Sequence, residues 1–104
     1  MSSPDTIEYE LDTWRGRIYL LRIRGTPSYF DPDDFAVTVY YKDAATETHI
    51  EIARVDTAHD FTHFDRLFRN PPDKKPVEWD IWDAVDHFEE NWPTYAKRYE
   101  ENRT

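Results

Sequence analysis

Apolar and polar residues alternate through the first half of the chain with the period of two that half-buried strands show. The alternation predicts strands at Thr6–Trp14, Arg17–Arg24, Phe35–Lys42 and about Glu47–Val55. In the second strand, Arg22 and Arg24 lie on the face opposite the main apolar face. In the third strand, Tyr40 lies opposite the face that carries the valines. One face of the predicted sheet is therefore apolar and the other is partly charged.

After the fourth predicted strand, the alternation of apolar and polar residues is less regular. Thr62–Arg69 predicts a fifth, shorter strand, in which Phe64 and Phe68 share a face. Gly25–Asp34 predicts a loop because it combines two prolines with a cluster of aspartates. Asn70–Pro76 also predicts a loop, since its three prolines cannot donate to a strand ladder.

From Asp80 the period changes to three and four, which is typical of an amphipathic helix. Its predicted core stripe consists of Trp82, Val85, Phe88, Trp92, Tyr95 and Tyr99. Pro93 lacks an N–H and clashes with the preceding turn, so we expect a kink or break near Asn91. The fold class is therefore α+β: a four- or five-stranded antiparallel sheet followed by a C-terminal helical segment kinked or broken near Asn91–Pro93. We expect one domain over residues 1–104, frayed at 1–5 and 101–104.

The composition narrows the class of protein. A chain of 104 residues has room for one core. It has no cysteine, which excludes disulfides, thiolate metal sites and cysteine nucleophiles. The longest uncharged apolar run, Ile18–Leu21, is too short to span a bilayer, and the N-terminus lacks a signal-peptide pattern. We expect a cytoplasmic protein with no membrane partner and no cofactor.

Acidic residues outnumber basic ones by 22 to 13, which gives a net charge of −9. This excess is typical of a halophilic protein, whose mutual carboxylate repulsion is screened within ~3 Å at 1 M salt. An ordinary acidic protein is the alternative. In molar salt the negative charge does not exclude a nucleic-acid partner, because electrostatic forces between the protein and phosphate are mostly screened. Base stacking would then have to provide the binding energy.

Residues 54–66 hold the densest cluster of chemistry-bearing side chains. Three interpretations stay open. His59, His63 and Asp56 or Asp65 could ligate a divalent metal, although four-residue spacing brings two imidazoles together only on a helix, so no metal site is predicted. The cluster could also be structural, with turns formed by Asp56 and surface ion pairs formed by Asp65.

The third interpretation is acid–base chemistry on a phosphodiester, as in a small ribonuclease. His59 or His63 would exchange protons, because histidine titrates near neutrality. Arg54 and Arg66 would stabilise the charge that develops on phosphate, and Asp56 completes the candidate catalytic set.

A second candidate site is the sheet face away from the helix. Arg22 and Arg24 lie there with Tyr40, and Arg54 is expected beside them. Cations around an aromatic ring would form a platform on which RNA bases could stack. The alternative is that an exposed sheet face simply needs polar cover.

The run Ala53–His59, the following His63–Asp65 and the later Asn91, Trp92, Tyr95 and Tyr99 resemble a family of small haloarchaeal proteins of unknown function over nearly the whole chain. Over the strand and the Asp-x-Ala-His portion alone, the chain is also similar to TumE-type toxin components of toxin–antitoxin pairs. The second resemblance points to Asp56 and His59 as candidate site residues, and it departs from the pattern at Thr57. It implies a ribonuclease-type toxin with a DNA-binding antitoxin-like partner. The alternative function is a non-catalytic module that recognises a protein or RNA through its sheet face or aromatic loop.

Overall fold

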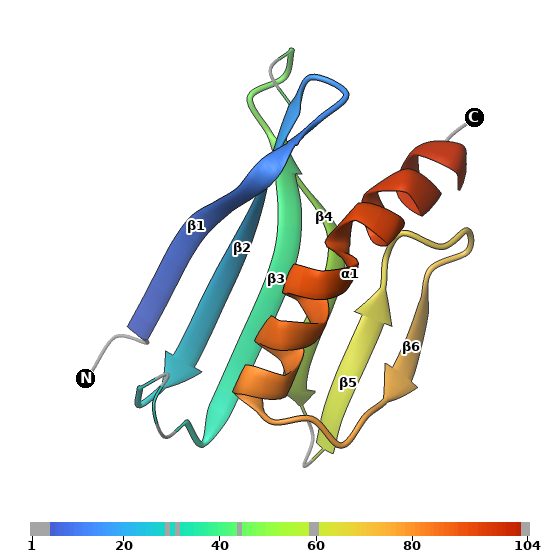
Figure 1. Cartoon of the computed structure of the whole chain (residues 1–104). Coiled ribbons are helices and arrows are strands. Elements are labelled where there is room, and N and C mark those ends of the chain that lie inside the picture. Colours follow the sequence, from blue (N-terminus) through green and yellow to red (C-terminus); the bar gives the residue numbers. More distant parts are fainter. Residues whose placement is uncertain (1–4, 29, 31, 44, 59–60, 103–104) are drawn as a thin grey trace.

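The computed structural model describes residues 5–28, 30, 32–43, 45–58 and 61–102. It contains six strands followed by one helix: β1 (Asp5–Trp14), β2 (Arg17–Thr26), β3 (Asp34–Lys42), β4 (His49–Ala58), β5 (Phe61–Arg66), β6 (Asp73–Pro76) and α1 (Ile81–Asn102). The strands form one sheet in chain order, and every neighbouring pair is antiparallel. The helix crosses one face of this sheet, over β3 and β4 (Figure 1). The predicted α+β class is confirmed.

The number of strands is the main correction to the predicted sheet, because the structure has six strands and not four or five. The sixth, β6, lies within the segment that was predicted as a loop, and it pairs with β5 from Asp73 to Pro76. The prolines at 71 and 72 precede the strand, and Pro76 is its last residue. An edge strand needs to donate on one side only, so proline is tolerated at its end.

The apolar face of the sheet packs against α1 and forms the core. Alternation places Tyr19, Leu21, Val37 and Val39 on this face, each 0 % exposed. The first hairpin closes tightly because Arg15 and Gly16 adopt φ angles of 52° and 75°, the left-handed pair that a two-residue turn requires. This turn fixes the register of β1 and β2, and therefore decides which of their side chains point to the opposite face.

The helix begins with a capping box in which Asp80 and Asp83 accept hydrogen bonds from each other's backbone N–H at 2.8 and 3.0 Å. It then continues through Pro93 to Asn102, so the predicted break near Asn91 is wrong, whereas a kink there stays a prediction. Phe88 before the proline and Tyr95 after it are both buried against the sheet. This packing of both halves offsets the roughly 3 kcal/mol that proline costs inside a helix.

The core stripe of the helix differs from the prediction at its first turn. Ile81 and Ala84 are buried, whereas Trp82 is 42 % exposed. At the ends of the chain, Asp5 belongs to β1 and residues 101–102 belong to α1; residues 1–4 and 103–104 lie outside the described part. No helix in the described residues has the length and apolar character to span a membrane.

Candidate functional site

The face of the sheet away from α1, called the open face below, carries a continuous row of polar side chains. One register position runs across all six strands through Glu8, Arg22, Thr38, Arg54, Asp65 and Lys74. Cross-strand neighbours on one face have Cβ atoms ~5 Å apart, so each side chain can reach the next. The row therefore holds two groups of charges, Glu8 with Arg22 on one side of the uncharged Thr38 and Arg54 with Asp65 and Lys74 on the other.

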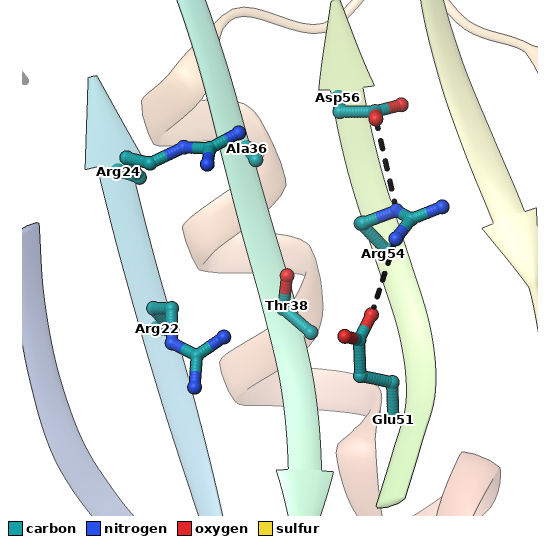
Figure 2. A pocket seen from close by; sticks show the side chains of 7 residues that line it. All are labelled: Arg22, Arg24, Ala36, Thr38, Glu51, Arg54 and Asp56. Atoms are coloured by element: carbon teal, nitrogen blue, oxygen red, sulfur yellow. Dashed lines mark hydrogen bonds and ion pairs between the residues drawn. The ribbon is translucent and has the colours of Figure 1, made fainter. Parts of the chain in front are cut away.

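A hollow of about 130 Å³ lies in the middle of the open face. Figure 2 shows its lining, with Arg22 and Arg24 projecting from β2 on one side and Arg54 and Asp56 from β4 on the other. The strand between them contributes small side chains, including Ala36, and this is why the surface is recessed there. A hollow of this volume has room for several ordered waters or for a phosphate group.

Arg54 is held by three carboxylates. Its guanidinium donates to Asp65 Oδ2 at 2.9 and 3.2 Å and to Glu51 Oε1 at 3.2 Å, and its Nε lies 3.7 Å from Asp56 Oδ2. The Asp65 side chain is only 5 % exposed, while that of Arg54 is 36 % exposed. The pairing fixes the position of Arg54 and neutralises its charge locally.

Arg22 is fixed by a different set of contacts. Its Nε donates to Glu8 at 2.7 Å, and its guanidinium lies 4.7 Å from the centre of the Tyr40 ring. The hydrogen bond from Arg22 holds the pKa of Glu8 below its usual value. Tyr40 donates to the same carboxylate at 3.0 Å, and its pKa is raised by burial and then by this bond. Tyr40 is 0 % exposed and covered by Arg22, so its ring is not a free stacking platform.

Among the three arginines that line the hollow, Arg24 is the one whose side chain no described residue holds in place. It is exposed, and it forms no ion pair and no side-chain hydrogen bond with any residue that the structure describes. Its nearest register partner on β3 is Ala36, which offers no polar atom. A charged group without a protein partner at the rim of a hollow can bind an anion at little cost.

Asp56 and His63 are register partners on β4 and β5. Asp56 Oδ1 and His63 Nδ1 are both buried, and neither has a hydrogen-bond partner in the described part of the chain. Unpartnered buried polar atoms are rare in folded proteins and are often found where a protein has a function to perform. The structure thus brings two of the predicted catalytic residues together, next to Arg54.

The open face also carries two aromatic residues that the sequence did not indicate as candidate site residues. His49 is exposed and lies against Tyr40 with ring centroids 4.8 Å apart. Phe61 is 52 % exposed and lies 4.1 Å from the ring of His63. The register places these pairs near opposite ends of β4, about 30 Å apart at ~3.3 Å per residue.

The remaining predicted residues are separated from this group. Arg66 points to the helix side of β5, where it donates to both oxygens of Asp73 at 2.6 Å. His59 lies outside the described residues. No group of three or more metal-ligating side chains occurs within the described ranges.

Comparisons with known proteins complete the description. Residues 4–104 match the sequence profile of a domain of unknown function, DUF7718. No curated protein and no solved structure matches the chain.

Proposed function

The chain belongs to the DUF7718 family of domains of unknown function, and for this member we propose that the open face binds single-stranded RNA. The observation that carries the proposal is the hollow lined by three arginines, of which Arg24 forms no ion pair with any described residue, while the carboxylates Glu51 and Asp56 in the same lining are engaged by Arg54. Guanidinium groups suit phosphate because they donate two parallel hydrogen bonds to it. One phosphate of an RNA strand would occupy the hollow, with Arg24 as its principal partner.

Base stacking supplies the second part of the proposed interaction. His49 and Phe61 present exposed rings on the same face, beyond either end of the arginine hollow. Stacking on such rings contributes ~1–3 kcal/mol per base and depends little on sequence. A strand that spans both rings would pass over the hollow, which favours an extended, single-stranded ligand over a duplex.

The charge of the chain sets the conditions for binding. With a net charge of −9, long-range repulsion opposes RNA in dilute buffer. If the acid excess is an adaptation to high salt, as we propose, this repulsion is screened in the working solution, whereas stacking is not. Binding should therefore persist at about 1–2 M KCl, where most phosphate-driven complexes have dissociated.

Fluorescence anisotropy with end-labelled oligonucleotides of four to twelve nucleotides tests the proposal. Arg24→Gln and Phe61→Ala should each weaken binding at least fivefold, the effect of losing about 1 kcal/mol. The matched control is Arg15→Gln, because Arg15 is exposed in the turn between β1 and β2 and lies outside the hollow. Absence of binding up to millimolar protein, or equal weakening by the control, would sink the proposal.

A second function, cleavage of the bound RNA, is favoured by the Asp56–His63 pair. The two side chains are not hydrogen-bonded to each other in this structure, so a side-chain rotation would first bring Asp56 Oδ1 to His63 Nδ1. Asp56 would then hold the Nδ1 proton, and Nε2 would accept the proton of a ribose 2′-hydroxyl. The 2′-oxygen would attack the adjacent phosphorus, and the bond from phosphorus to the 5′-oxygen would break, leaving a 2′,3′-cyclic phosphate. Water would protonate the departing 5′-oxygen. Arg24, which pairs with no described carboxylate, would stabilise the charge on phosphate, and Arg54 would contribute less because its carboxylate partners offset its charge.

A cleavage assay separates the two functions. Incubation of labelled RNA with the protein should yield fragments with cyclic phosphate ends, and His63→Gln should abolish them while leaving anisotropy within twofold. His59→Gln, in the same assay, tests the candidate residue outside the described part. RNA that stays intact with the wild-type protein would leave the chain as a non-catalytic binding module.

A toxin-like role with a DNA-binding protein partner extends the cleavage proposal to the cell. Induced expression in a haloarchaeal host should arrest growth, and His63→Gln should relieve the arrest. Co-expression of a small DNA-binding protein encoded beside the gene should relieve it as well. Normal growth with intact RNA contradicts the toxin role and leaves RNA binding untouched.

A further inference from the structure

A second cavity, of about 270 Å³, lies on the other side of the sheet, between α1 and the β5–β6 edge. It is about twice the size of the hollow on the open face. Its cations come from three parts of the chain: Arg66 and Arg69 from β5 and the turn after it, Lys75 from β6 and Arg98 from α1. Among the residues that the structure describes, no acidic one lines it. In a chain with a net charge of −9, such a concentration of positive charge is unexpected as mere surface cover.

The cations of this cavity fall into two classes. Arg66 and Arg69 both bond to Asp73, at 2.6 and 2.9 Å, and are thereby held in place. Lys75 and Arg98 are exposed, and neither forms an ion pair or hydrogen bond with a described residue. Two charges from separate elements that face one cavity without protein partners are suited to a doubly charged anion.

Aromatic rings form the walls of the same cavity. Phe68 and Tyr95 are stacked with centroids 4.5 Å apart and planes 9° apart, and Trp79 lies 4.4 Å from His87. His87 and Tyr95 are joined by a short hydrogen bond between the imidazole Nε2 and the phenol oxygen. Burial lowers the pKa of His87, so its ring is neutral at pH 7 and offers a flat polar surface and not a further charge.

We propose that this cavity binds a mononucleotide, with the base against the half-buried rings of Trp79 and His87 and the phosphate between Lys75 and Arg98. A mostly apolar cavity with a few convergent polar groups is the usual form of a small-molecule site. The planar walls select a ring system, and the paired cations select a phosphate. RNA is proposed to bind on the opposite face of the sheet. This cavity would therefore bind free nucleotides whether or not RNA occupies the open face.

Isothermal titration calorimetry of the full chain with adenosine 5′-monophosphate tests the proposal, with adenosine and inorganic phosphate as separate probes. The nucleotide should bind at least about tenfold more tightly than either fragment. The double variant Lys75→Gln/Arg98→Gln should weaken nucleotide binding tenfold or more and bring it close to that of adenosine. The matched control is Lys42→Gln/Lys97→Gln, which also removes two positive charges, from exposed residues outside the cavity lining, and should stay within twofold of the wild type.

A second variant keeps the test independent of stability. Thr94→Trp places a large side chain at an exposed position of the cavity lining, so it should block the nucleotide while the thermal unfolding curve stays unchanged. Arg24→Gln, on the open face, should leave nucleotide binding unaffected. Equal affinity for nucleotide, adenosine and phosphate, no heat of binding at millimolar nucleotide, or full binding by the Lys75→Gln/Arg98→Gln variant would each overturn the proposal.

Discussion

Arg54 on β4 and Asp65 on β5 are directly opposite each other, and the guanidinium donates two hydrogen bonds to one carboxylate oxygen. Asp65 is 3 % exposed as a residue, so its charge depends on this partner. Lys74 approaches its other oxygen only to 3.7 Å. The pair therefore both fixes the edge of the arginine hollow and satisfies a buried charge.

Removal of both partners should cost less than the two single removals added together. We expect Arg54→Ala to destabilise the fold by about 1–3 kcal/mol, less than for a fully buried pair because Arg54 is partly exposed to solvent. The double variant with Asp65→Ala should be less destabilised than the sum of the single variants. Urea unfolding of the four proteins measures the coupling. Strict additivity would show that the pair contributes nothing beyond its separate side chains.

Substitution of Arg24, unlike that of Arg54, should leave the stability of the fold almost unchanged. It has no hydrogen-bond or ion-pair partner among the described residues, so Arg24→Gln should change the free energy of unfolding by less than ~0.5 kcal/mol. Arg22→Gln removes the bond to Glu8 and the contact with Tyr40, and should cost about 1 kcal/mol more. The same urea titrations provide both values. A large loss of stability in Arg24→Gln would assign this residue to structure and weaken the case for ligand binding.

Alternation along the strands was sufficient to predict which residues share the open face. The period of two placed Arg22 and Arg24 there, with Arg54 expected beside them, and in the structure all three lie in the lining of one hollow. The position of Asp56 opposite His63 was beyond the sequence pattern, because register between β4 and β5 depends on the turn that joins them. A shift of one residue would have moved His63 to the helix face.

The parts that were missed depend on tertiary packing. β6 has little strand propensity of its own, and it exists because the β5 edge offers unpaired backbone groups to it. The cavity beside α1 depends on how the helix docks relative to that edge, which no local pattern encodes. In the sequence, Arg98 and Lys75 have the pattern of ordinary surface charges. Only the folded structure shows that they line one cavity.

The half-buried His87 predicts a specific pH dependence. Its pKa is lowered from 6.5 by burial, and the charge of Lys75 lowers it further against the opposing charge of Glu90. Below pH 6.5 the unfolded chain therefore binds a proton that the folded chain resists, so the free energy of unfolding should fall as the pH drops from about 7.5 to 5.5. The lowered pKa values of Glu8 and Asp73 act only at more acid pH.

Thermal unfolding of the wild type and of His87→Gln across this range provides the measurement. The variant should lose the part of the slope between pH 7 and 5.5 that His87 contributes, while it keeps the acid loss below about pH 4.5. Parallel curves for the two proteins would show that His87 is not a source of the pH dependence.

Pro93 predicts a stabilising substitution. It is exposed inside α1, so Pro93→Ala removes no buried contact. Alanine supplies an N–H to the carbonyl of Glu89 and relieves the clash of the ring, which is worth up to ~3 kcal/mol, offset by ~0.4–1 kcal/mol for the freer unfolded chain. We expect a net gain of about 1–2 kcal/mol in urea unfolding. An unchanged or lower stability would mean that the helix already accommodates the proline by a local distortion, such as the predicted kink.

The acid excess predicts that salt stabilises the fold. On α1, Asp86 lies three residues after Asp83 and four before Glu90, and all three are exposed, so like charges repel along one surface of the helix. Raising KCl from about 0.1 to 1 M shortens the screening length from ~10 to ~3 Å and should weaken this repulsion. The midpoint of urea unfolding should therefore rise with KCl, and it should rise less steeply in Asp86→Asn. Because salt also weakens the ion pairs of Arg54 and Arg22, a falling midpoint would show that attraction within the open face outweighs repulsion between the acids, and would contradict salt adaptation.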